Sequence, residues 1–255
     1  MVFSLQKEAN LMKAIDMYNK KHGRDFLFAN VKPKSKNSIF PKSVELPDVV
    51  DADVEEYQQN VQTALKKHEK IYNAFKDRIP NVEALIYRYD YWGYLKGNIT
   101  LSVHPDIKKR WGITQELFGA FFNVDLDKPY CSLFPDLEPG SEGSAFFFKP
   151  EKGDVILANP PYTDFWVGWT CRQILDKWRG KCTFYVVIPA WDCSTRDRLK
   201  MEDMRTCYYD VVELIENAEE HKLYRDFPFY NGIERRDYSF KKDRKKDVPI
   251  HVIKI

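Results

Sequence analysis

The chain has 255 residues, of which 44% are hydrophobic and 15% aromatic, enough to form the core of one large domain or of a domain with an extension. Lysine and arginine nearly balance the acidic residues, so the net charge is only +2 and the calculated pI is about 8.1. This balance excludes a generally basic nucleic-acid coat, and any contact with nucleic acid has to come from a local patch.

The amino-terminal part, residues 1–97, is predicted to be helical. Apolar residues recur at helical spacing from Leu5 onward, and Gly23 can end this first helix. A second helix is predicted to begin near Asp51 or Asp53, either of which can cap it, and to end before Pro80. We expect this helical region to be an amino-terminal extension of the domain formed by residues 98–255.

The remaining residues, 98–255, alternate strand and helix patterns, which is typical of an α/β domain. Helices are predicted over residues 165–178 and 196–206. Seven strands are predicted over residues 116–120, 130–136, 145–148, 154–158, 182–189, 210–215 and 249–255. Their number and order favour a doubly wound, Rossmann-like sheet of the kind found in methyltransferases.

The most informative stretch is Asn159-Pro160-Pro161-Tyr162, which follows the apolar strand predicted over residues 154–158. Neither proline has an N–H for a sheet ladder, so the strand must stop at Asn159. The side-chain oxygen of Asn159 and the carbonyl of Pro160 can both accept hydrogens from an exocyclic amine, and Tyr162 can stack on a planar base. The pattern therefore favours methylation of an adenine amino group. The plainer interpretation is a Pro-Pro turn with Tyr162 in the core.

Several pieces in the same order resemble the cap-specific adenosine N6-methyltransferase family, also called phosphorylated CTD-interacting factor. They are Glu116–Asn123, Tyr130–Asp136 (Tyr-Cys-Ser-Leu-Phe-Pro-Asp), Ala158–Tyr162, Phe184–Trp191 and Glu220–Tyr224. The resemblance implies S-adenosylmethionine as methyl donor and N6 of the first transcribed adenosine of capped mRNA as acceptor.

Two departures from the family pattern stand out. The family motif commonly ends in Phe where this chain has Tyr162, which keeps the ring. The WW domain of the animal members is not recognisable, so we expect a compact member without it. Recruitment to phosphorylated polymerase is then not implied, and protein partners stay unknown.

The site for the methyl donor S-adenosylmethionine is predicted at the ends of the first two strands of the sheet. Asn159 is predicted to adjoin this donor site. Gly119 supplies the only glycine of the first turn, and Asn123 follows it in the same piece. Asp136 is the predicted ribose-binding carboxylate, with a Pro-Asp turn residue as the alternative. Glu116 is a second candidate, and it can equally cap a helix or pair with a lysine.

Recognition of a cationic 7-methylguanine cap calls for aromatic rings and basic side chains. The aromatic candidates are Trp191, Trp166 and Tyr230, each of which can instead serve in packing. Arg235 and Arg236 are the candidates for contact with the cap phosphates, although a run of charges is usually a solvated face.

The five cysteines show no metal-ligand spacing, so no metal is predicted. We recognise no signal peptide and no transmembrane run, and therefore expect free thiols in a reducing intracellular compartment without membrane contact. The nucleus, the cytoplasm and a viral source all stay open. Two other functions compete with the cap hypothesis: N6-adenine methylation of DNA or uncapped RNA, and a non-catalytic RNA-binding subunit of the same fold.

Overall fold

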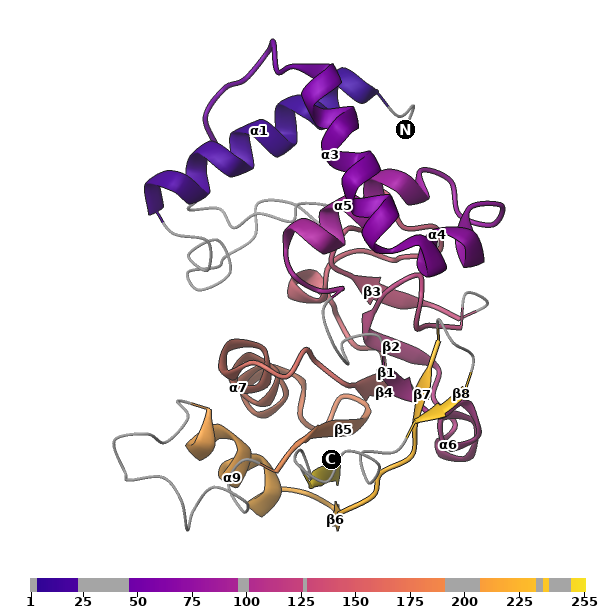
Figure 1. Cartoon of the computed structure of the whole chain (residues 1–255). Helices are drawn as coiled ribbons and strands as arrows, with labels where there is room; N and C mark the ends of the chain where they lie inside the picture. The colour runs from indigo at the N-terminus through magenta and orange to yellow at the C-terminus, as the bar shows by residue number, and fades with distance from the viewer. Residues whose placement is uncertain are drawn as a thin grey trace. The chain divides into compact units, whose positions relative to one another are not determined.

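The computed structural model describes residues 4–22, 46–95, 101–125, 128–190, 207–232, 236–238 and 249–255 (Figure 1). By their contacts the residues form two compact units. The helical unit comprises Met1–Thr100 together with Phe134–Pro139, and the sheet unit comprises Leu101–Leu133 together with Gly140–Ile255. Each unit has fully buried apolar residues of its own, such as Leu85 in the first and Leu117 in the second.

The helical unit contains α1 (Leu5–His22), α3 (Val54–Lys67), α4 (Glu69–Phe75) and α5 (Val82–Tyr91). The predicted cap of the second helix is confirmed at Asp53, whose Oδ1 accepts hydrogen bonds from the backbone N–H groups of Glu55 and Glu56 at 2.8 and 3.1 Å. The single helix predicted there is wrong. It is divided into α3 and α4 at His68, whose backbone is not helical (φ −118°, ψ 35°).

A buried arginine organises the helical unit. Arg88 of α5 is only 2% exposed, and its Nε and Nη2 donate to the two carboxylate oxygens of Glu8, each at 2.7 Å. Its Nη1 donates to both carboxylate oxygens of Asp136 at 2.9 Å. Burial lowers the pKa of Arg88, but the hydrogen bonds and charges of the two carboxylates outweigh it and raise that pKa above its usual value. Glu8 and Asp136 are thereby held to one residue of α5.

The sheet unit is built on six strands in the order β3 (Tyr130–Ser132), β2 (Gln115–Gly119), β4 (Val155–Ala158), β5 (Thr183–Pro189), β9 (Ile250–Lys254) and β6 (Glu220–Tyr224). The first four strands are parallel, and β9 runs antiparallel to both of its neighbours. Ile156, Leu157 and Ala158 of β4 are all fully buried or nearly so, as expected for a central parallel strand.

Both faces of this sheet are covered (Figure 1). Apolar residues of α7 (Asp164–Gln173) and α9 (Tyr208–Glu216) pack against one face. The other face packs against a small antiparallel sheet and the partly buried side chains of α6 (Pro105–Trp111). The small sheet has the order β1 (Leu101–Val103), β7 (Phe229–Asn231) and β8 (Arg236–Tyr238).

The mixed α/β class is confirmed, but the large sheet has six strands over the described ranges, and two of the seven predicted strands are wrong. The segment predicted as a strand at 145–148 forms the 3₁₀ helix η2 (Ala145–Phe147), because Ser144 caps it by accepting a hydrogen bond from the Phe146 N–H. The segment at 210–215 lies in α9, where buried Val211 and Leu214 have helical rather than alternating spacing. The exposed edge strand β6 was not predicted, since four of its five residues are exposed.

The helix predicted over residues 165–178 is confirmed as α7 and the π-helical turn η3 (Ile174–Trp178). The helix predicted over 196–206 lies outside the described residues. Among the helices that the structure describes, none is both long and apolar enough to cross a membrane.

Candidate functional site

The topology of the sheet unit places the Asn159 loop beside the turn that follows β2. Strands β2 and β4 are parallel neighbours, with Glu116 opposite Leu157, so Gly119 and Ala158 end at the same edge of the sheet. From β2 the chain crosses to β3 on one side and later returns to β4 on the other. The carboxyl ends of β2 and β4 therefore flank a topological switch point, which is where open α/β sheets bind ligands.

The loop itself is held between β4 and the start of α7. The carbonyl oxygen of Pro161 accepts a hydrogen bond from the Thr163 N–H at 2.8 Å, and Thr163 caps α7 through the N–H of Trp166 at 3.4 Å. Pro160 is a buried residue, yet no hydrogen bond from the described part of the chain reaches its carbonyl oxygen. Since buried carbonyls are normally paired, this oxygen is available as an acceptor for a ligand.

Asn159 and Tyr162 contact each other across the two prolines. The Tyr162 hydroxyl donates a hydrogen bond to Asn159 Oδ1 at 3.2 Å. The ring of Tyr162 packs against the apolar cluster that contains Leu157 and Val187. Burial raises the pKa of Tyr162, which keeps the hydroxyl protonated. The sequence placed both residues in one loop but did not reveal this hydrogen bond.

The turn after β2 is closely packed and internally bonded. A Cβ at Gly119 would lie 2.5 Å from the Tyr130 ring and 2.5 Å from Val124, so glycine is needed there for packing. Asn123 Oδ1 accepts a hydrogen bond from the Ala120 N–H at 2.9 Å. The predicted donor-site residues Gly119 and Asn123 thus shape the turn that follows β2.

A neighbouring glycine, which sequence reasoning missed, approaches the same turn. A Cβ at Gly232, just after β7, would lie 2.1 Å from the carbonyl oxygen of Phe122 and 3.0 Å from the Cα of Asn123. Only glycine permits this approach of the β7 end to the turn. The sequence Tyr230-Asn231-Gly232 was the available signal, but an Asn-Gly pair marks a turn and does not identify the residues that pack against it.

The two predicted carboxylates are both ion-paired within the protein. Glu116 accepts from Lys108 Nζ at 2.6 Å, and both side chains are buried, so the lysine-pairing alternative is the one present. Asp136 is paired with Arg88, and its side chain is 26% exposed. Carboxylate oxygens have about four acceptor positions, so Asp136 keeps capacity for a further donor.

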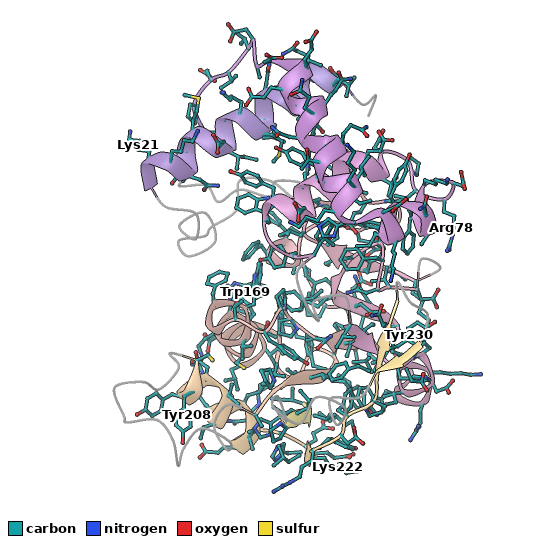
Figure 2. All side chains as sticks on the ribbon, viewed as in Figure 1. Lys21, Arg78, Trp169, Tyr208, Lys222 and Tyr230 are labelled. Carbon is teal, nitrogen blue, oxygen red and sulfur yellow. The ribbon has the colours of Figure 1, made fainter. Side chains whose placement is uncertain are left out.

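Of the five predicted cap-binding residues, the structure describes the side chains of two, Trp166 and Tyr230. Trp166 is 5% exposed and packs among aromatic rings that include Phe118, Phe146 and Trp169, which is a core role. Tyr230 of β7 is partly exposed (Figure 2). Its ring lies edge-on to that of His104. Arg236 belongs to β8, while its side chain, Trp191 and Arg235 lie outside the described residues.

The described cysteines are Cys131, Cys171, Cys182 and Cys207, and all four are free thiols. Burial raises the pKa of the Cys182 thiol to about 12, so it is protonated at neutral pH. In the ranges that the structure describes, no group of three or more His, Cys, Asp or Glu side chains could hold a metal ion.

Residues 56–226, about two thirds of the chain, match the family model described as phosphorylated CTD interacting factor 1 WW domain. The chain belongs to this family. The match runs from α3 to just beyond β6 and includes the Asn159 loop, Gly119 and Asp136. Because the description itself contains the words WW domain, the expectation of a member without that domain stays a prediction. No curated protein matches the chain.

Proposed function

We propose that this protein transfers a methyl group from S-adenosylmethionine to N6 of the cap-adjacent adenosine of mRNA. The observation that carries the proposal is the Asn159 loop at a switch point of the sheet. It presents a side-chain oxygen and the carbonyl of Pro160, which accepts no hydrogen bond from the described residues. Family membership supports the same chemistry and the capped substrate.

The residues of the loop account for the activation of the adenine amine. The lone pair of N6 is spread into the ring, which makes the amine a weak nucleophile. Asn159 Oδ1 and the Pro160 carbonyl would accept the two N6 hydrogens and favour a tetrahedral nitrogen with a localised lone pair. Both acceptors are constrained before the reaction, Asn159 Oδ1 by its hydrogen bond with Tyr162 and the Pro160 carbonyl by the two consecutive prolines, so little reorganisation is needed.

The donor would be held near the turn after β2. Of the two candidate carboxylates, Glu116 is buried with Lys108, whereas Asp136 is partly exposed and has acceptor capacity left. Gly119, Asn123 and Asn159 are the proposed donor-site residues of the sheet unit. Of the two candidate carboxylates, Asp136 of the helical unit is the one that is exposed and keeps acceptor capacity for a ribose hydroxyl. S-adenosylmethionine, when bound, supplies an electrophilic methyl group whose C–S bond breaks as the bond to N6 forms.

The test of this function is methyl transfer to A-starting capped RNA by the wild type and by Asn159→Ala. We expect the variant to lose about 10²–10³ in kcat, by analogy with the loss of one preorganised hydrogen-bonding group in a transition state. Donor affinity should fall far less than kcat, because Asn159 is only one of several proposed donor-site residues, and the thermal unfolding midpoint should stay close to that of the wild type. Near-normal turnover by a folded Asn159→Ala protein would refute the catalytic role of the loop.

Substrate arms in the same assay separate the competing functions. Transfer to duplex DNA or to uncapped RNA at the same rate would support a general adenine methyltransferase. RNA binding without any transfer by the wild type would support the non-catalytic subunit. We also propose a reducing intracellular location, nuclear or cytoplasmic, because the four described cysteines are unpaired.

A further inference from the structure

The Tyr162–Asn159 hydrogen bond is separate from any stacking by the Tyr162 ring, and the inference drawn from it rests on the proposed function. The Tyr162 ring alone would serve as a stacking surface for a base. The structure adds a hydroxyl that donates to Asn159 Oδ1 at 3.2 Å. Stacking does not require this contact, because a phenylalanine offers the same face.

A carboxamide presents two different ends, and only one of them suits an amine substrate. Rotation of the Asn159 side-chain amide by 180° exchanges an accepting oxygen for a donating NH₂ group. The N6 amine of adenine is a hydrogen-bond donor. An Asn159 NH₂ group facing it would therefore place two hydrogen-bond donors opposite each other. A neighbouring donor that bonds to the oxygen would favour the accepting orientation over the other.

Tyr162 has the properties of such a donor. Its ring packs against the cluster of Leu157 and Val187 from the two neighbouring strands β4 and β5, which restrains the position of the hydroxyl. Two prolines separate it from Asn159, so the backbone between the two side chains has few conformations available. A phenol is protonated at neutral pH and able to donate, and burial raises the pKa of Tyr162 further.

We propose that Tyr162 is a positioning residue whose hydroxyl holds the Asn159 carboxamide with Oδ1 as the acceptor for N6. A carboxamide oxygen has two lone pairs, so Oδ1 can accept from Tyr162 and from N6 at the same time. The hydroxyl acts through Asn159, whereas the ring acts on the base.

Tyr162→Phe keeps the ring and removes only the hydroxyl. We expect kcat to fall about fivefold, the equivalent of one hydrogen bond between neutral groups, while KM for RNA and donor affinity change less than twofold. The matched control is Tyr185→Phe, the same substitution on a residue that packs against the same apolar cluster. It should leave kcat unchanged, and thermal unfolding should confirm that both variants are folded.

The decisive arm repeats Tyr162→Phe in an Asn159→Asp background. A carboxylate offers an oxygen in either orientation, so the hydroxyl is no longer needed to select one. We expect the cost of Tyr162→Phe on kcat to fall below twofold there. An equal cost in both backgrounds, or an unchanged kcat for Tyr162→Phe alone, would overturn the positioning role.

The wild-type arm distinguishes this inference from the proposed function. If the wild type transfers no methyl group to RNA or DNA, the proposed function fails and the inference fails with it. If the wild type is active and Tyr162→Phe matches it in kcat, only the inference fails. If the loss appears in KM with kcat unchanged, the ring environment rather than the carboxamide was altered, and the inference is again overturned.

Discussion

At the scale of single residues, the sharpest question is what Asp136 binds. Its carboxylate shares Arg88 with Glu8, and both carboxylates stabilise the buried guanidinium. Asp136 differs from Glu8 in exposure, since its side chain is 26% exposed and that of Glu8 only 6%. A ribose-binding carboxylate has to be open to the surface, so of these two carboxylates Asp136 is the candidate.

This difference yields a paired prediction. Asp136→Asn and Glu8→Gln each remove one of the two carboxylates that neutralise the Arg88 guanidinium. Both variants should therefore have a lower free energy of unfolding, by up to about 3–5 kcal/mol for the loss of a buried ion-pair partner. Only Asp136→Asn should also weaken S-adenosylmethionine binding, by at least tenfold, because charge-assisted hydrogen bonds to the ribose are lost. Isothermal titration and chemical unfolding measure the two effects separately.

Glu8→Gln is the control for Asp136→Asn, because both variants disturb Arg88 and only one changes the proposed ribose ligand. Equal donor affinity in both, with the same loss of stability, would show that Asp136 is a structural partner of Arg88 alone. Weakened donor binding in both would show that the effect comes from the disturbed Arg88 and not from a direct contact of Asp136.

At this scale the Asn159 loop could be predicted from the sequence, because an apolar run followed by two prolines is typical of the end of a buried strand. It did not reveal the Tyr162–Asn159 hydrogen bond, which depends on side-chain rotamers and on the turn between them. Nor did it choose the partner of Glu116, since Lys108 lies on a different element and the two meet only in the folded chain.

At the scale of elements, prediction succeeded where burial is complete and failed where it is partial. Strands β4 and β5 are buried on both faces, and their continuous apolar runs identify them. Strand β6 is an exposed edge with the polar sequence Glu-His-Lys-Leu-Tyr, so it has no hydrophobic pattern. Residues 210–215 are apolar enough for a strand, but they form part of α9. Its Val211 and Leu214 lie on one face of the helix and pack into the core.

The approach of Gly232 to the turn after β2 can be tested directly. Gly232→Ala would place a Cβ 2.1 Å from the Phe122 carbonyl oxygen, so the turn that holds Asn123 must shift. We expect a loss of about 1–3 kcal/mol in the free energy of unfolding and at least a fivefold weaker donor affinity. Donor titration and chemical unfolding are the measurements.

Gly112→Ala is the matched control for that experiment. Gly112 has a left-handed backbone (φ +68°), but a Cβ there meets no atom within 4 Å. The variant should lose about 1–2 kcal/mol of stability from backbone strain and keep its donor affinity. Unchanged donor affinity in Gly232→Ala at a similar loss of stability would show that the turn after β2 does not bind the donor.

At the scale of the whole molecule, substrate choice has to come from more than the catalytic loop. One adenine offers one stacking face and one polar edge, which is too little to select the first nucleotide over all other adenosines. A cationic cap base and its triphosphate would add stacking and electrostatic contacts. With a net charge of only +2, the chain must supply these contacts locally, and they should weaken as salt rises.

The central claim is cap-adjacent methylation, and the most direct measurement is the position of the methyl group. RNA that begins with cap-A and also contains internal adenosines is incubated with the protein and S-adenosylmethionine, then digested and analysed by mass spectrometry beside the uncapped RNA. We predict N6-methyladenosine at the first transcribed position of capped RNA alone, with inhibition by free cap analogue at low salt. Methyl groups on internal adenosines, or equal labelling of capped and uncapped RNA, would contradict the account.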